Sequence, residues 1–308
     1  MLKNTSEIIQ SEQFKNLEFI AQQIVEGFIT GLHKSPYHGF SVEFAEHRLY
    51  NAGESTKHID WKLFARTDKL FVKKYEEETN LRCQIVIDVS SSMLYPHNEK
   101  GKISKLAFSV YCAAALINLL RKQRDAVGIT LFSNNIDLHT EAKLSVSHAK
   151  RLYAELDKLL VSSDKPEQKL TEASKSLHLI AESIHKRSLV VIFSDMFENE
   201  STDEIFSAIQ HLKYNKHEVI LFHVSDKNKE EEFVFENRPY KFIDLETNEE
   251  IKLNPNDIRT VYKERYKDFV SDIKNKAIQH KIDYVEADIN RDFNAVLLPY
   301  LIKRGKLY

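Results

Sequence analysis

Polar side chains follow directly on an apolar run in the first third of the chain. The run is Cys83 to Ile87, and Asp88, Ser90 and Ser92 come after it at alternate positions. A short apolar run predicts a buried β-strand. In an open parallel sheet, ligands bind just beyond the carboxyl ends of the strands. One carboxylate and two hydroxyls at such a place are hard oxygen ligands, so they predict a divalent-cation site and a binding function.

A second apolar run places another carboxylate near the same edge. Residues 189–193 read as a buried strand, and Ser194 and Asp195 follow it. Asp195 is therefore expected to hold the ion from the other side. Thr171 opens the helix that leads into this strand and is expected to supply a third hydroxyl, which Ser162, Ser163 or Ser174 could replace. The competing interpretation is that Asp88 and the serines only cap the following helix, and that Asp195 is a solvated loop acid.

The composition limits the classes of function. The 308 residues include 44 basic and 46 acidic side chains, a formal net charge of -2, and 42% are hydrophobic. This balance argues against nucleic-acid or membrane-surface binding, which usually needs a basic excess. The most apolar helical stretch, residues 107–120, is shorter than the roughly 20 residues that span a bilayer, and residues 1–10 lack a signal-peptide core. We therefore expect a soluble cytoplasmic protein with no membrane span.

The apolar periodicity predicts an α/β domain. Expected strands lie near 82–88, 125–133, 189–193, 219–224 and 283–288, with a short antiparallel strand at 137–141. Expected helices lie near 101–123, 146–161, 171–186, 202–213 and 257–280, with a short one at 293–302. Strands that alternate with helices predict a doubly wound, mostly parallel sheet.

Two further segments complete the predicted organisation. Residues 6–33 have helical spacing, and 37–80 form a small β-containing segment, so the division falls into residues 1–80 and 81–308. The second part carries an inserted hairpin at about 228–255, with residues 233–235 on one arm and 240–243 on the other.

The residues after the first strand resemble a known metal site. Asp-Val-Ser-Ser-Ser at 88–92 matches the Asp-x-Ser-x-Ser pattern of the von Willebrand factor type A fold and its metal-ion-dependent adhesion site. The resemblance implies that Ser90, Ser92 and Thr171 bind the ion, while Asp88 and Asp195 act directly or through water. It implies Mg²⁺ first, with Mn²⁺ or Ca²⁺ as alternatives, and one coordination position left for an acidic side chain of a client protein.

The segment before this strand resembles a bacterial family labelled "domain of unknown function 58". The resemblance lies in Gly39-Phe40-Ser41-Val42-Glu43-Phe44, Arg48-Leu49-Tyr50, Ile59-Asp60-Trp61-Lys62 and Ala65-Arg66, although Glu54 and Lys57-His58 depart from the family's pattern. Members are commonly encoded beside MoxR-type AAA+ ATPases. The resemblance therefore implies such an ATPase as a partner.

These observations predict a non-enzymatic, metal-dependent protein-binding module that acts as an adaptor or co-chaperone. Contact residues are expected beside the ion and in the preceding segment: Met93, Tyr95, Met196 and Phe197, and Arg48, Asp60, Trp61 and Lys62. Simple packing at the top of the sheet, and an ion-pair network that pins the segment, are the alternatives for the two groups.

Enzyme classes fit the sequence less well. It has no Gly-x-x-x-x-Gly-Lys-Ser/Thr loop, no Gly-x-Ser-x-Gly elbow and no His-Glu-x-x-His, which P-loop NTPases, α/β-hydrolases and zinc proteases require. The alternatives that stay open are a structural scaffold with a degenerate metal site and, behind it, a metal-dependent phosphatase or nuclease.

Overall fold

The computed structural model describes residues 16–31, 46–50, 61–74, 81–96, 102–162, 173–197, 202–245, 249–293 and 295–297. The chain forms two compact units, one of residues 1–31 with 81–308 and the other of residues 32–80. The predicted division fell at residue 80, so the two differ in where the N-terminal helix belongs. That helix, α2 (Leu17–Gly31), is part of the larger unit.

The larger unit is built on a six-stranded sheet in the order β10-β7-β6-β3-β4-β5. Five of the strands are parallel and only the edge strand β5 runs antiparallel. The strands are β3 (Arg82–Asp88), β4 (Ala126–Phe132), β5 (Ile136–His139), β6 (Leu189–Ser194), β7 (Glu218–Ser225) and β10 (Asp283–Asp288). The doubly wound, mostly parallel sheet that the sequence predicts is confirmed.

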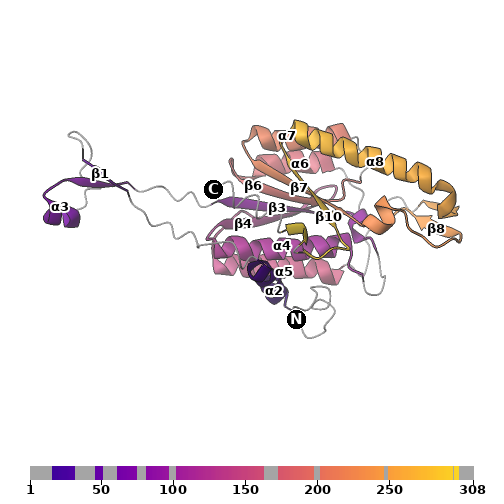
Figure 1. The fold of residues 1–308 in the computed structure, drawn as a ribbon, viewed down its shortest axis with the longest axis horizontal. Coiled ribbons are helices and arrows are strands. Elements are labelled where there is room, and N and C mark those ends of the chain that lie inside the picture. Colours follow the sequence, from indigo (N-terminus) through magenta and orange to yellow (C-terminus); the bar gives the residue numbers. More distant parts are fainter. Residues whose placement is uncertain are drawn as a thin grey trace. The chain divides into compact units, whose positions relative to one another are not determined.

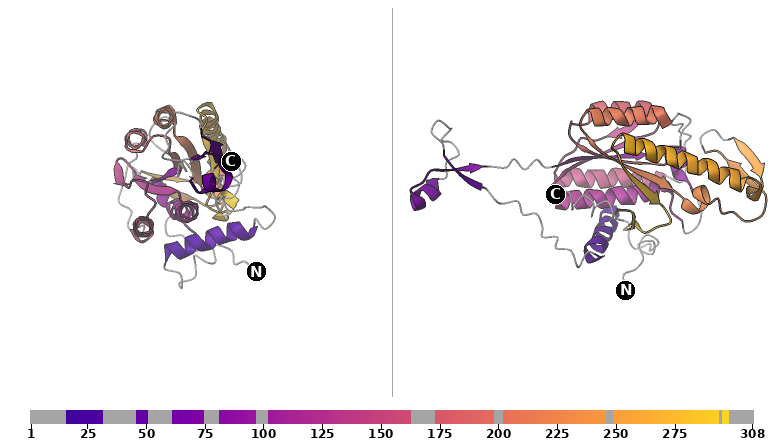
Figure 2. Two further views of the ribbon diagram at one scale, coloured as in Figure 1. Left: turned by 90° about the vertical axis from the view of Figure 1, so that its left-hand side faces the viewer. Right: turned by 45° about the horizontal axis from the view of Figure 1, so that its top comes forward.

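Helices cover both faces of this sheet (Figures 1 and 2). One apolar core joins a face of the sheet to α2, α4 (Lys105–Lys122) and α5 (Val146–Ser162). The other core joins the opposite face to α6 (Ala173–Ser183), α7 (Thr202–Tyr214) and α8 (Pro255–Gln279). Parallel strands that are covered on both sides read as continuous apolar runs, which is why β3 and β6 were visible in the sequence.

The polar edge of the sheet lies at a topological switch point. From β3 the chain passes to α4 on one face, and from β6 it passes to α7 on the other, although β3 and β6 are hydrogen-bonded neighbours. Connections that leave adjacent strands in opposite directions open a crevice at their carboxyl ends, where α/β proteins bind ligands. Asp88 ends β3 and Asp195 follows β6, so both predicted carboxylates flank this crevice.

The N-terminal helix packs against α4. Its apolar residues Leu17, Ile20, Ala21 and Ile24 are buried in the same core as α4 and α5. Arg121 at the end of α4 donates a hydrogen bond to Glu18 at 2.8 Å. The amphipathic stripe predicted this helix, and the predicted stretch before residue 16 lies outside the described residues.

The inserted hairpin is real, but its predicted pairing was wrong. Strand β8 (Tyr240–Ile243) pairs with β9 (Glu250–Leu253), and not with residues 233–235. Phe233 and Phe235 instead pack by their rings against Phe242, and Phe233 also contacts Tyr262 of α8. Aromatic side chains in residues 233–235 and in β8 make both stretches strand-like by composition, so composition alone did not choose the partner.

In the smaller unit, β1 (Glu46–Leu49) pairs antiparallel with β2 (Phe71–Lys74), and α3 (Trp61–Thr67) lies between them in sequence. Trp61 is 60% exposed and meets Phe64 edge to face, with 6.2 Å between ring centroids. The small β-containing segment that the sequence predicts is therefore present.

Candidate functional site

Asp88 is fully buried at the end of β3. One carboxylate oxygen accepts the backbone N–H of Ser90 at 2.9 Å, and the other accepts the Ser194 hydroxyl at 2.8 Å. Burial, and then the nearby Asp195 carboxylate, raise the pKa of Asp88 from 3.8 to about 7. A carboxylate in this state lacks a cation of its own, because the described contacts it makes are with neutral donors.

The hydroxyls of Ser90 and Ser92 are hydrogen-bonded to each other, with 3.0 Å between the two oxygens. Adjacent oxygen ligands of an octahedral Mg²⁺, each about 2.0–2.1 Å from the ion, lie roughly 2.9 Å apart. The longer bonds to Ca²⁺ would separate them further. The donor set and this spacing therefore fit a small, hard divalent ion at Asp88, Ser90 and Ser92.

Asp195, the second predicted carboxylate, is engaged by a lysine. Lys105, the first residue of α4, contacts an Asp195 oxygen through its ammonium at 2.6 Å and a Glu230 oxygen at 2.7 Å. The other Asp195 oxygen accepts the backbone N–H of Phe197 at 3.1 Å. Because one of its partners is a cation, Asp195 fits the metal less simply than Asp88, whose described partners are neutral donors.

The buried charged groups around Lys105 include more acids than bases. Burial works against the Lys105 ammonium, but the carboxylates of Asp195 and Glu230 outweigh it and raise the pKa of Lys105. Burial also raises the pKa of Glu230, and Lys105 opposes that shift. One ammonium therefore faces two carboxylates, with Asp88 as a third acid close by.

A histidine supports Asp195 from the neighbouring strand. His223 of β7 is buried, and burial lowers its pKa to about 4, so its ring is neutral. Its Nε2 lies 3.0 Å from the Asp195 carbonyl oxygen and its Nδ1 lies 2.8 Å from the Tyr284 hydroxyl. Met196, next in the chain, has a φ of 55° in the left-handed region, which is uncommon for a side chain of this kind. Such conformations cluster at functional sites.

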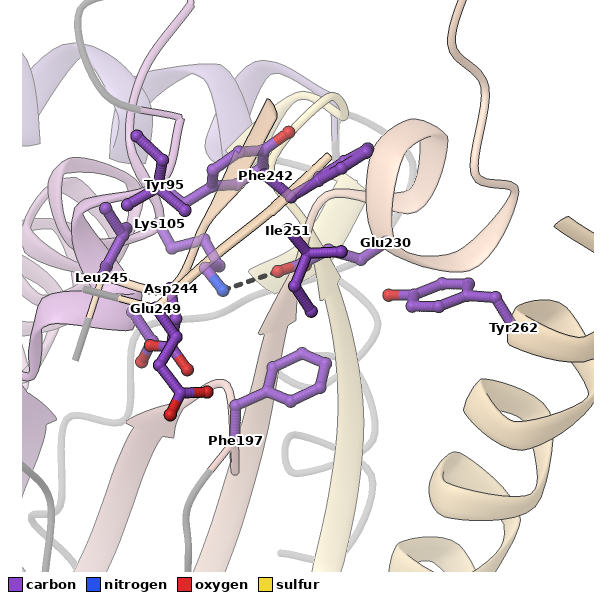
Figure 3. Close-up of a pocket in the computed structure, with 12 residues that line it drawn as sticks. Tyr95, Lys105, Phe197, Glu230, Phe242, Asp244, Leu245, Glu249, Ile251 and Tyr262 are labelled. Atoms are coloured by element: carbon purple, nitrogen blue, oxygen red, sulfur yellow. Dashed lines mark hydrogen bonds and ion pairs between the residues drawn. The ribbon is translucent and has the colours of Figure 1, made fainter. Parts of the chain in front are cut away.

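A pocket of about 550 Å³ opens beside these groups. Part of its lining comes from the start of α4 and from segments that follow strands: Ser92, Tyr95, Lys105, Phe197 and Glu230. The hairpin and α8 supply the rest: Phe242, Ile243, Asp244, Leu245, Glu249, Ile251 and Tyr262. Figure 3 shows the ammonium of Lys105 directed at Glu230, with Phe197 and Ile251 nearby. The hairpin thus brings an aromatic and acidic surface to the site at the strand ends.

The structure places the other predicted site residues unevenly. Tyr95 and Phe197 line the pocket, whereas Met93 and Met196 are buried in the two cores and present no surface to a partner. Of the four partner contacts predicted in the sheet unit, Tyr95 and Phe197 are therefore the two that a partner can reach. Thr171 and its substitute Ser163 lie outside the described residues, while Ser162 ends α5 and Ser174 lies in α6.

The predicted contacts of the smaller unit are described only in part. Asp60 lies outside the described residues. Arg48 lies in β1 and Lys62 in α3, and the exposed Trp61 begins α3.

Sequence reasoning did not single out Lys105 or Glu230. Glu230 lies in the π-helical turn η3 (Lys227–Glu231), within a run of charges that reads as solvated surface. Lys105 carried one usable signal, since a cation in the first turn of a helix opposes the helix dipole. The 125 residues that separate this pair put their contact beyond sequence pattern.

The turn that delivers Lys105 is capped by Ser104, whose hydroxyl accepts the backbone N–H of Ala107 at 3.1 Å. We expect Ser104→Ala to lower the free energy of unfolding by about 1 kcal/mol, because an orphan N–H of the first turn loses its partner. Chemical denaturation followed by circular dichroism measures this. Ser104→Thr, which keeps a hydroxyl, should recover most of the loss, and equal stability of both variants would contradict the cap.

Two features are absent from the part of the chain that the structure describes. No group of three or more histidine, cysteine, aspartate or glutamate side chains there is arranged to hold a metal ion. The predicted ion set relies instead on hydroxyls with two carboxylates. No helix within the same ranges is long and apolar enough to cross a membrane.

Fold and site together define a doubly wound α/β protein with its polar groups at the switch point of the sheet. The family model "Protein of unknown function DUF58" matches residues 46–271, well over half of the chain. The chain belongs to this family, as its sequence resemblance predicts.

The similarity to curated relatives and to solved structures is weaker than the family match. Uncharacterized proteins of Mycobacterium bovis and Mycobacterium tuberculosis are 30% identical over 79 residues, 26% of this chain and 25% of theirs. The match thus spans about a quarter of the length of these relatives. BatB of Bacteroides thetaiotaomicron is 15% identical, with a TM-score of 0.37 over 68% of this chain and 90% of that one. An aerotolerance-related membrane protein of Bacteroides fragilis is also 15% identical, with a TM-score of 0.40 over 70% and 100%.

Proposed function

We propose that this protein is a non-enzymatic module of the von Willebrand factor type A kind, which binds partner proteins through a divalent cation. Mg²⁺ is the proposed ion, held by Asp88, Ser90 and Ser92, with Asp195 as a further ligand directly or through water. The observation that carries the proposal is the pair of serine oxygens 3.0 Å apart, beside a fully buried aspartate at the switch point of the sheet. When bound, the ion supplies positive charge to an acidic side chain of the partner.

The pocket supports a protein as the ligand. Ser92 belongs to its lining, as do the aromatic residues Tyr95 and Phe197. A partner side chain that enters there meets apolar rings around one polar point, an arrangement typical of the central contacts of an interface. The residues of this chain would orient the acidic group and exclude water from it. The resemblance to the "domain of unknown function 58" family supports a MoxR-type AAA+ ATPase as the partner that this module serves.

The proposed absence of catalysis rests on how the polar groups are paired. The Ser90 and Ser92 hydroxyls lie against each other, and the Ser194 hydroxyl donates to Asp88. His223 places its nitrogens next to the Asp195 carbonyl oxygen and the Tyr284 hydroxyl. Nucleophilic catalysis by serine needs a base within hydrogen-bond reach of the attacking hydroxyl. Among these groups, the two nitrogens of His223 pair with groups other than serine hydroxyls. Ser194 does meet a carboxylate, that of Asp88, but both residues are buried, away from a substrate in solution.

A second candidate is a scaffold whose metal site is degenerate. The observation that favours it is the contact of Asp195 with Lys105, because an ammonium already provides the charge that a metal would supply. Under this alternative, partner binding does not depend on divalent ions.

The experiment that tests the proposal compares the wild type with the double variant Ser90→Ala/Ser92→Ala. At a Mg²⁺ concentration about tenfold above Kd, ligand linkage should stabilise the wild type by about 1.4 kcal/mol. The double variant should not respond, because both hydroxyl ligands are gone. Thermal unfolding with Mg²⁺ and with a chelator measures the difference.

A matched control is Ser147→Ala, a change of the same kind at an exposed serine in α5. It should respond to Mg²⁺ like the wild type. Binding of the purified cognate MoxR-type ATPase, measured with and without Mg²⁺, then tests the partner. Equal binding to wild type and double variant under both conditions would favour the scaffold.

A further inference from the structure

The ammonium of Lys105 is a positive charge that the fold itself places at the site. Its side chain is 2% exposed, and it contacts Asp195 at 2.6 Å and Glu230 at 2.7 Å. Figure 3 shows the second of these contacts. The ammonium also lies 5.4 Å from the ring centroid of Phe197 and 5.9 Å from that of Tyr95. Carboxylates and aromatic rings thus surround it, an environment suited to a cation.

This placement is costly for stability alone. Lys105 begins α4, where the partial positive charge of the helix terminus disfavours a cation. Taking an ammonium and a carboxylate out of water also costs free energy, and apolar residues of similar volume often serve a fold equally well. A lysine at this position therefore suggests a role that depends on its charge.

Asp195 shows what that role involves. One of its oxygens contacts the Lys105 ammonium and the other accepts the Phe197 N–H. A divalent ion that draws on Asp195 must compete with one of these partners. Asp88, by contrast, is held only by neutral donors among the contacts described above. The two carboxylates at the switch point are thus unequal.

We propose that Lys105 is the resident cation of this site: its ammonium neutralises Asp195 and competes with the divalent ion for that carboxylate. The inference rests on the proposed function, because it concerns the same ion site. Lys105 thereby sets how tightly the site binds its ion, and wild-type affinity is lower than the oxygen ligands alone would give.

The competition also reaches the pocket. Glu230, the second partner of Lys105, accepts the backbone N–H of Asp226 through its other oxygen at 2.7 Å. Asp226 caps η3, and Glu230 and Lys105 both line the pocket. An ion that binds Asp195 displaces the Lys105 ammonium from it, so that Lys105 pairs with Glu230 alone. Ion binding thereby alters the charge pairing on the pocket wall where a partner would dock.

Isothermal titration with Mg²⁺ alone tests the inference on the wild type and on Lys105→Met, which keeps most of the side-chain volume. Removing a competing positive charge close to a divalent ion should tighten binding about tenfold or more. Equal or weaker affinity in the variant would overturn the inference. If Lys105→Met alone does not fold, Lys105→Met/Glu230→Gln removes one carboxylate with the ammonium and serves the same titration.

The outcomes separate this inference from the proposed function. If Lys105→Met binds Mg²⁺ tightly and the wild type does not bind it, the competition by Lys105 is supported and the metal-dependent function of the natural protein is rejected. If both bind Mg²⁺ equally, the metal site is supported and the competition is rejected. If neither binds Mg²⁺, both hypotheses are rejected. Ser90→Ala/Ser92→Ala in the Lys105→Met background should abolish the gain, and a gain that persists would place the new ion elsewhere and overturn the inference.

Discussion

Lys105→Met is expected to lower the free energy of unfolding by about 3–5 kcal/mol when divalent ions are chelated, because removing one partner of a buried ion pair leaves the other charge uncompensated. Here two carboxylates, those of Asp195 and Glu230, lose their common partner. Methionine fills most of the space but neutralises neither of them. Urea denaturation followed by far-UV circular dichroism measures the loss.

The matched control is Lys102→Met, three residues earlier on the exposed side of the same segment. Exposed substitutions usually change stability by less than about 0.5 kcal/mol. The loss in Lys105→Met should also shrink at low pH, because the two abandoned carboxylates can then take up protons. A variant within about 1 kcal/mol of wild type at neutral pH would show that the carboxylates are solvated or neutral, contrary to the charge pairing described above.

Asp88→Asn should do the opposite and stabilise the ion-free protein, by roughly 3 kcal/mol at about pH 8. Burial and then the Asp195 carboxylate raise the pKa of Asp88 to about 7 from 3.8, so the native state binds this proton more tightly than the unfolded chain does. The wild type therefore loses stability as the pH rises from about 4 to about 7, and is most penalised above that range. An amide carries no charge, so the variant escapes this loss.

The hydrogen bonds of Asp88 set the limit of the gain. In the variant, the carbonyl of the new amide can still accept the Ser90 N–H, but its NH₂ group must donate to Ser194, whose hydroxyl then loses its acceptor, at a cost of about 1 kcal/mol. Denaturation of both proteins at several pH values in chelator gives the comparison, with the exposed Asp268→Asn on α8 as control. If the difference in unfolding free energy between wild type and Asp88→Asn is the same at about pH 4 and at about pH 8, Asp88 is not a buried carboxylate without a cation.

The sequence predicted the framework because its signals are local. Strands β3 and β6 are buried on both faces, so each reads as an unbroken apolar run followed by a polar residue. The short connection after β4 required an antiparallel partner, and β5 is that partner. The packing of α2 on α4 and the pairing of β8 with β9 depend on contacts between distant or equally suitable segments, which local pattern does not rank.

The candidate site was predicted from the same signals, and only in its first half. Asp88, Ser90 and Ser92 follow one strand in sequence, and the structure brings their atoms together. Asp195 was expected to face an ion, whereas in the fold it contacts the Lys105 ammonium at the start of α4. The same ammonium also contacts Glu230 of η3. Charge pairing across 90 and 125 residues follows from the tertiary fold, and a charged run on the chain gives no sign of which member turns inward.

The position of Trp61 gives the two compact units separate optical signatures. It is the single tryptophan of the chain, it belongs to the unit of residues 32–80, and it is largely exposed. Its emission therefore reports on that unit, whereas the far-UV dichroism of the chain is dominated by the helices and strands of the sheet unit. Melting curves recorded by tryptophan emission and by far-UV dichroism should have different midpoints if the two units unfold independently. A partner should then shift the curve of the unit that it binds, so one unlabelled sample shows whether it binds the sheet unit, the smaller unit or both.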